Sequence, residues 1–321
     1  MRSNKILKDN IELIDKLNKI VPRNGAGKSL KEFSENLWDD EKVRKLGTAE
    51  IIKKLRSMNI EFNLEQFKEQ TTQYICAISL AEGHYYTQNH SAQGKDEDFI
   101  WIAICELWKR FFPQRWNIEM IDDCMQDGYE EIKNKNYEEG IIKWETAWDM
   151  IKYIVPARIT SVSGADAFMP EPLTQSIYNW CQDFETELYN AGVKEKGYLK
   201  KLIKYCREFC ERFYGTEGLI IQNMLRAEAE SYLLLGDRVL ADELFEGIIK
   251  KFPDSVWGYV GWADTYTLDD LYGRKFIDHG RAEKIYKLGL IRCKEEKDVI
   301  YERLESLCKR VKKTAGYDLT D

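Results

Sequence analysis

The stretch from Asn223 to Ser255, NMLRAEAESYLLLGDRVLADELFEGIIKKFPDS, constrains the fold more than any other part of the chain. Its apolar residues recur at helical spacing on both sides of Gly236-Asp237, and Pro253 ends the second run. Ala229 and Ala241 supply the small side chains that two antiparallel helices need where they cross closely. Because one such hairpin cannot bury its apolar face alone, the stretch predicts several stacked copies.

The spacing of this hairpin matches the 34-residue tetratricopeptide pattern, with Tyr232 and Phe245 at the aromatic positions that fill gaps between neighbours. Less regular copies begin at Ile121, Ile177 and Ser255. In the first of these, Gly128 takes the crossing position. The alternation typical of strands is nearly absent. We therefore predict an all-α chain, a tetratricopeptide-like (TPR-like) right-handed α-solenoid of about four helical hairpins over residues 118–293, closed by a helix over roughly 296–312.

Residues 1–115 do not follow the repeat, and we predict that they form a separate N-terminal helical cap. Residues 116–321 then form the TPR-like helical repeat domain, with the boundary near Pro113. Residues 156–172, PARITSVSGADAFMPEP, are the one long irregular stretch. Loops of this length are often functional, and a spacer between repeats explains the stretch equally well. Both interpretations stay open.

Several stretches between residues 95 and 293 resemble the corresponding stretches of a known protein family. They are DEDFIWIAICELWKRFFP, MIDDCMQDGYEEI, NWCQDFETELYNAG, YCREFCERF and the repeats around Gly236 and Trp257. The family is that of bacterial tetratricopeptide-like proteins, many of which end in a SEC-C zinc motif. The resemblance implies an α-solenoid that engages another macromolecule. Where that family has a P-C-x-C-G-S-G-K-type tail, this chain reads KKTAGYDLTD, so zinc is not implied, and we expect neither a metal nor a cofactor.

The net charge of −7 does not favour a nucleic-acid backbone or an anionic membrane as the main partner. The start, MRSNKILKDNIELIDKL, lacks the apolar core of a signal peptide. The most apolar run, FIWIAICELW from Phe99, is about half the length that spans a bilayer. We therefore expect a cytoplasmic protein with no membrane partner.

The eight cysteines are scattered and form no C-x-x-C pair. This usage is typical of buried thiols in a reducing compartment rather than of a disulfide framework or a zinc site. Cys206 and Cys210 share one helix face, but two ligands are too few for a structural zinc.

The segment Gly25–Ser29, GAGKS, resembles the end of a phosphate-binding loop. That loop needs a first glycine at position 22, which is Pro22, and a preceding strand, where this chain has a helical stripe. Ser29 and Glu32 instead have the spacing of a capping box at a helix start. We predict a connector between two helices and no bound nucleotide.

Catalytic candidates are few, and we expect no enzyme. Glu82, His84 and His90 are one possible metal set, for a hydrolase, but their spacing matches no helical ligand pattern, and we predict a surface loop after a helix ending near Leu80. The carboxylate pairs Asp122-Asp123 and Asp269-Asp270 point about 100° apart on a helix, so neither pair converges on one site.

The first helices of stacked hairpins line a concave groove, and the repeat frame places a mixed, slightly acidic set of side chains there. They are Asp122, Gln126, Tyr129, Asn179, Asp183, Asn223, Arg226, Glu230, Trp257 and Asp264. Such a surface suits an internal segment or helix of a partner protein, in particular a basic one. The alternative is that these residues are a solvated polar face without a partner.

The sequence thus predicts a non-catalytic scaffold or adaptor that binds a segment of a partner protein in this groove. A regulatory protein associated with nucleic acid or the translation machinery is the alternative, suggested by the zinc-tailed members of the similar family. The basic end of the chain, from Lys309 to Lys313, complements a helix C-terminus and does not by itself require nucleic acid.

Overall fold

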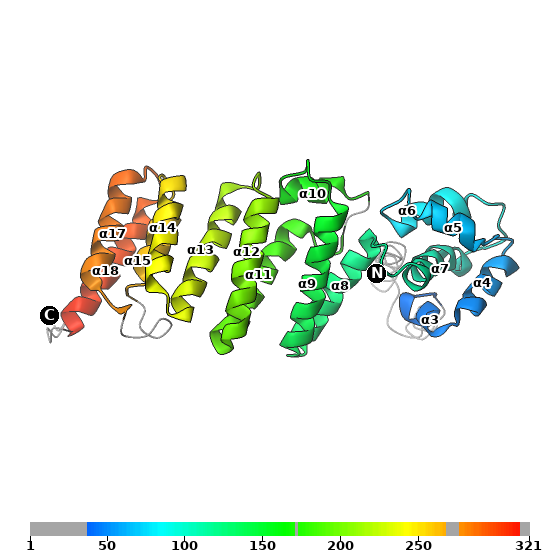
Figure 1. Cartoon of the computed structure of the whole chain (residues 1–321), viewed down its shortest axis with the longest axis horizontal. Coiled ribbons are helices and arrows are strands. Elements are labelled where there is room, and N and C mark those ends of the chain that lie inside the picture. The colour runs from blue at the N-terminus through cyan, green and yellow to red at the C-terminus, as the bar shows by residue number, and fades with distance from the viewer. Residues whose placement is uncertain (1–36, 171–172, 268–275, 315–321) are drawn as a thin grey trace, which may run out of the picture. The chain divides into compact units, whose positions relative to one another are not determined.

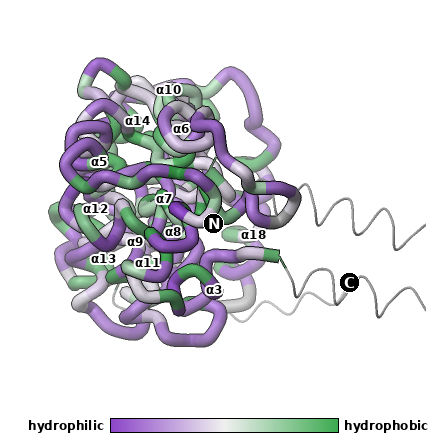
Figure 2. Tube along the Cα trace, turned by 90° about the vertical axis from the view of Figure 1, so that its right-hand side faces the viewer, coloured by the Kyte–Doolittle hydropathy of each residue, from purple (hydrophilic) through white to green (hydrophobic). Residues whose placement is uncertain are grey.

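The computed structural model describes residues 37–170, 173–267 and 276–314 (Figure 1). The capping box at Ser29 and the pair Asp269-Asp270 lie outside the described residues. Within these ranges the chain is all-helical, with fifteen α-helices, one π-helix and no strand, and the helices pack in neighbouring pairs. Short purple and green stretches alternate along the tube in Figure 2, as expected for amphipathic helices. The all-α prediction is confirmed, and the solenoid stays a prediction.

The chain divides into two compact units. The first comprises residues 1–158 and 164–180, and the second comprises residues 159–163 and 181–321. The boundary expected near Pro113 came from the point where the repeat pattern begins, whereas the compact units divide later in the chain.

The first unit is built around one helix whose middle is apolar and buried on all sides. Its early helices are α3 (Asp40–Lys45), α4 (Thr48–Ser57), α5 (Leu64–Gln70), α6 (Ala77–Ala81), the π-helix η1 (Glu82–Tyr86) and α7 (Lys95–Phe111). Residues 99–105 of α7 are all buried, and α3, α4 and α6 pack against this helix. The most apolar run of the sequence is therefore a core helix.

Glu119 connects α6 to the next helix, α8 (Ile118–Lys133). Its carboxylate is 2% exposed and accepts hydrogen bonds from the backbone N–H of Ala77 (2.8 Å) and Ile78 (3.2 Å) and from the Cys76 thiol (2.9 Å). The negative charge thus satisfies the free N–H groups at the start of α6.

The hairpin of α8 and α9 (Tyr137–Ile154) has the predicted close crossing. A Cβ atom at Gly128 would lie 2.2 Å from Nε1 of Trp144, so only glycine fits there. Trp144 Nε1 donates to the carbonyl of Met125 at 2.9 Å. The crossing role of Gly128, predicted from the repeat frame, is confirmed.

The predicted irregular stretch 156–172 contains a short helix, α10 (Val162–Phe168). Val162 and Ala165 are fully buried, so packing stabilises a helix that is too short to form alone. The carboxylate of Asp166 accepts hydrogen bonds from the backbone N–H of Ile177 (2.7 Å) and Tyr178 (3.0 Å). These residues begin α11 (Ile177–Lys194), so Asp166 caps that helix.

Among the described residues, the second unit contains the remainder of α11 and six further helices. They are α12 (Lys196–Arg212), α13 (Gly218–Leu235), α14 (Arg238–Lys251), α15 (Val256–Asp264), α17 (His279–Arg292) and α18 (Lys297–Thr314). Neighbouring pairs are α12 with α13, α13 with α14, α15 with α17, and α17 with α18 (Figure 1). One apolar cluster runs through α13, α14, α15, α17 and α18 and includes Ala229, Phe245, Tyr259, Ala282 and Ile300.

The hairpin predicted from Asn223 to Ser255 corresponds to α13 and α14. Gly236 ends α13 with φ +97°, a left-handed conformation that favours glycine. Asp237 caps α14 by accepting from the N–H of Leu240. Ala229 and Ala241 are buried at 0% and 1% exposure, as their crossing role requires.

A polar network joins α14, α15 and α17 beside this apolar cluster. The carboxylate of Asp242 accepts from Trp262 Nε1 and from the Tyr266 hydroxyl, both at 2.7 Å. Arg238 lies 3.2 Å from the same carboxylate and Arg281 lies 3.5 Å from it. The Arg238 guanidinium also stacks 3.4 Å above the ring of Tyr266. One carboxylate therefore holds donors from three helices.

Candidate functional site

Arg226 of α13, one of the predicted groove residues, lies against α15 in the second unit. A Cβ atom at Gly261 of α15 would lie only 2.8 Å from Cδ of Arg226, so the absence of a side chain at Gly261 lets the arginine stem lie across α15. Arg226 pairs with Glu230, one turn later on α13, at 3.6 Å. Arg226 is 37% exposed and Glu230 is 17% exposed.

Three carboxylates, from α11, α13 and α15, interact electrostatically with this guanidinium. Burial raises the pKa of Glu185 to about 7; the charge of Arg226 opposes the rise and that of Glu230 adds to it. Burial also raises the pKa of Asp264, whereas the hydrogen bond from Tyr286 and the charges of Arg303, Arg310 and Arg226 lower it. We call Glu185, Arg226, Glu230 and Asp264 the Arg226 cluster. Its carboxylates are partly desolvated and outnumber its one guanidinium.

Asp264 also anchors the end of α15 to the helices that follow. The Tyr286 hydroxyl of α17 donates to its carboxylate, and Arg303 of α18 lies 3.6 Å from it. Asp264 is 20% exposed and Arg303 is 50% exposed. The carboxylate is thus held in one position by two helices, while the guanidinium of Arg303 reaches solvent.

Gln222 adds a buried polar group one turn before Arg226 on the same stripe of α13. Its side chain is 8% exposed, and its Oε1 accepts no hydrogen bond within the described residues. A buried acceptor without a donor lowers the stability of this part of α13.

The other predicted groove residues of the second unit are accessible only in part. Asp183 and Asn223 are half-buried on α11 and α13. Trp257 is half-buried and packs with one side against the apolar cluster. The indole therefore offers a fixed aromatic surface beside the polar residues.

The predicted groove residues of the first unit differ in accessibility. Asp122 is fully buried and accepts from the N–H (2.8 Å) and the hydroxyl (3.0 Å) of Thr174, so it has no surface for a partner. Gln126 and Tyr129 are half-buried, and the Tyr129 ring lies 4.8 Å from that of Trp144. Asn179 is exposed.

The predicted loop with His84 and His90 is present only in part: residues 82–86, with His84, form the π-helix η1, and His90 lies in the irregular segment that follows. The His84 ring lies 5.5 Å from that of Tyr74, and the His90 ring lies 4.9 Å from that of Tyr86. Each histidine thus packs on a tyrosine. Among the residues that the structure describes, no three His, Cys, Asp or Glu side chains are grouped to hold a metal.

The two cysteines that share a face of α12 are Cys206, which is buried, and Cys210, which is half-buried. Burial raises the pKa of Cys206 and raises that of Cys210 to about 12. Both are therefore protonated thiols at neutral pH, whereas a metal binds the thiolate.

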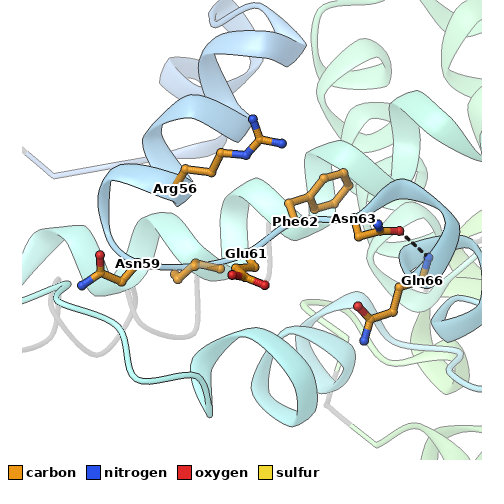
Figure 3. A pocket seen from close by; sticks show the side chains of 7 residues that line it. Arg56, Asn59, Glu61, Phe62, Asn63 and Gln66 are labelled. Atoms are coloured by element: carbon orange, nitrogen blue, oxygen red, sulfur yellow. Dashed lines mark hydrogen bonds between the residues drawn. The ribbon is translucent and has the colours of Figure 1, made fainter.

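A surface pocket of about 560 Å³ lies at the connection of α4 and α5 (Figure 3). Its lining residues are Arg56, Asn59, Ile60, Glu61, Phe62, Asn63 and Gln66. Figure 3 shows that Arg56, Asn59 and Glu61 point in different directions, and Asn63 accepts from the backbone N–H of Gln66 as the cap of α5. These polar groups do not converge on one point, so the pocket assembles no catalytic set.

None of the described helices combines the length and the apolar character that a bilayer span requires. Compared with family models, with curated proteins and with solved structures, the chain matches none of them.

Proposed function

We propose that this chain is a non-catalytic scaffold or adaptor that binds a basic segment of a partner protein at the Arg226 cluster. In this proposal the hairpins are TPR-like repeats of a right-handed α-solenoid, as the resemblance to SEC-C-associated proteins suggests, and the protein acts in the cytoplasm. The single observation that supports the proposal most is that Glu185 and Glu230 are partly desolvated carboxylates near one guanidinium, that of Arg226, with Asp264 close by and paired with Arg303.

A lysine or arginine of the partner complements this group in three ways. It supplies positive charge near Glu185 and Glu230, whose charges disfavour each other. It offers N–H donors for hydrogen bonds to these carboxylates. Hydrogen bonds between charged groups contribute about 1.5–3 kcal/mol each, more than an exposed ion pair. Trp257 adds an aromatic surface for the apolar stem of the same side chain.

The affinity should depend on pH through Glu185. Because the pKa of this carboxyl is about 7, about half of the molecules carry the negative charge at neutral pH. A basic segment should bind more tightly as the pH rises from 6 to 8, and Glu185→Gln should remove that dependence.

An affinity capture with matched baits tests the proposal. The test bait carries Glu230→Lys and Trp257→Ala, and the control bait carries Glu246→Lys on α14 and Tyr214→Ala, both at exposed positions. We expect a protein that the wild-type and control baits retain and the test bait loses. The captured protein is then titrated against each bait at pH 6 and pH 8.

Equal retention by the test and control baits would place the binding surface elsewhere and refute the role of the Arg226 cluster. Recovery of RNA in place of a protein, with a steep loss on adding salt, would favour the alternative of a nucleic-acid-associated regulator.

A further inference from the structure

The last described helix, α18, carries an apolar stripe that the other described residues cover only in part. Tyr301 is 59% exposed, Val311 is 41% exposed, Cys308 is exposed and Leu304 is half-buried. Exposed apolar residues are common singly, but three exposed ones along one helix, with the half-buried Leu304 among them, form a surface. The buried side of the same helix packs Ile300 and Leu307 into the apolar cluster, and Leu304 at its border contacts that cluster as well.

The stripe has the spacing of a coiled-coil seam. Its residues fall at 301, 304, 308 and 311, which are successive a and d positions of two heptads. α18 is 18 residues long, enough to present both heptads. A seam of this kind fits the apolar face of another helix.

The charges of α18 indicate which helix packs against this stripe. Before Ser306 the exposed charges are mainly acidic, with Asp298, Glu302 and Glu305, and after it they are basic, with Lys309, Arg310 and Lys312. Two copies of α18 placed in parallel bring like charges together. Two antiparallel copies bring the acidic half of each against the basic half of the other.

The apolar stripe is self-complementary in that antiparallel arrangement. Positions 301 and 311 lie equally far from Ser306, and so do positions 304 and 308. A two-fold axis at Ser306 places Tyr301 against Val311 of the second copy and Leu304 against Cys308 of the second copy. In an isologous contact each such pair occurs twice.

The charged flank of the seam agrees with the same axis. Asp298 and Lys312 occupy e positions, and the two-fold axis brings Asp298 close to Lys312 of the second copy. Glu305 approaches its own counterpart, and Lys309 lies 2.8 Å from it within each helix. Two attractive pairs therefore outweigh one contact between carboxylates that are already paired.

We propose that the stripe of Tyr301, Leu304, Cys308 and Val311 is a homodimer seam, in which α18 packs antiparallel against α18 of a second copy of this chain. The seam uses none of the four residues of the Arg226 cluster, although α18 also carries Arg303, which lies 3.6 Å from Asp264. A dimer presents two such clusters, and a partner with two basic segments gains avidity.

Sedimentation and light scattering of the full chain test the seam. We expect a dimer whose fraction rises with concentration between 1 and ~100 µM, as for associations of ordinary strength. Tyr301→Glu with Val311→Glu should make the chain monomeric, and because both positions are exposed the fold should survive. Val239→Glu with Ile291→Glu, at two other exposed apolar positions, should leave the dimer intact.

A charge exchange tests the direction of the helices. Asp298→Lys alone, and Lys312→Asp alone, should each weaken the dimer about tenfold, since each change affects two ion pairs. The double exchange should restore the wild-type affinity. Oxidation of the Leu304→Cys variant should give a covalent dimer through Cys308 of the second copy, which the wild-type chain should not form.

A wild-type chain that stays monomeric at ~100 µM would overturn the proposal, and so would a dimer that survives the Tyr301 and Val311 changes. A covalent dimer of the oxidised wild-type chain would overturn the antiparallel arrangement, because only parallel helices bring Cys308 against its own counterpart.

Discussion

Two glycine-to-alanine substitutions in the second unit should change stability in opposite directions. Gly247 lies in α14, where an added Cβ would meet nothing within 4 Å. Gly289 lies in α17, where an added Cβ would lie 2.8 Å from Cδ1 of Ile300 and 3.0 Å from Cβ and Cγ of Tyr259. The two positions share the helical backbone and differ in their surroundings, so they form a matched pair.

The magnitudes follow from two opposing terms. Alanine is more favourable than glycine inside a helix by about 1 kcal/mol. At Gly247 that gain stands alone, and we expect a stabilisation of about 0.5–1 kcal/mol. At Gly289 the Cβ of Tyr259 is fixed to the backbone of α15, so α15 and α17 must separate. Overpacking of this kind costs about 1–3 kcal/mol, and subtracting the helix gain of about 1 kcal/mol leaves a net loss of up to about 2 kcal/mol.

Hydrogen exchange read by mass spectrometry is the right assay, because the chain has two compact units and one melting curve would mix them. Exchange in peptides from residues 218–314 should slow with Gly247→Ala and quicken with Gly289→Ala. Equal effects of the two substitutions, in either direction, would refute the claim that the contacts at Gly289 decide whether alanine stabilises or destabilises the chain.

Three further predictions concern single side chains. Asp242→Ala should lower the free energy of unfolding by about 2–4 kcal/mol, since it leaves Arg238, which is 15% exposed, without its carboxylate. Denaturant unfolding measures this loss, and Lys250→Ala, at an exposed position, is the near-neutral control. Because the pKa of Glu185 is raised in the folded chain, the unfolded chain binds fewer protons between about pH 4.5 and 7, so the stability contribution of this group should fall as the pH rises through that window. Glu185→Gln should flatten that part of the pH profile, and an unchanged profile would exclude Glu185 as the cause. A thiol reagent should modify Cys308, the exposed cysteine, before the buried ones, and more slowly at protein concentrations that favour the dimer; a rate independent of concentration would count against the seam.

The hairpin of α13 and α14 could be predicted from the sequence because its signals are local. A left-handed glycine and an aspartate cap define the turn at Gly236-Asp237, and both act on atoms within a few residues. The crossing at Gly128 follows from the same repeat frame. The seven residues of α10 were not predicted, because a helix this short depends on packing that involves residues distant in sequence.

The candidate site was predicted only in part, for the same reason. A repeat frame indicates which side of a helix is outward but not what covers it. Asp122 has a groove position by that frame, yet it is buried by Thr174, 52 residues away. Glu185 escaped notice because its raised pKa results from burial and from charges on α13, none of which shows in the sequence around it.

The apolar cluster that runs from α13 to α18 has a mechanical consequence. Repeat proteins whose units touch only their neighbours can unravel one helix at a time. Here Tyr259 of α15 packs in one cluster with Phe245 of α14 and Ile300 of α18, so removing any one helix exposes apolar surface on the others. When the segment from α13 to α18 is pulled from its two ends in a force experiment, it should unfold in one large step and not in a series of small ones.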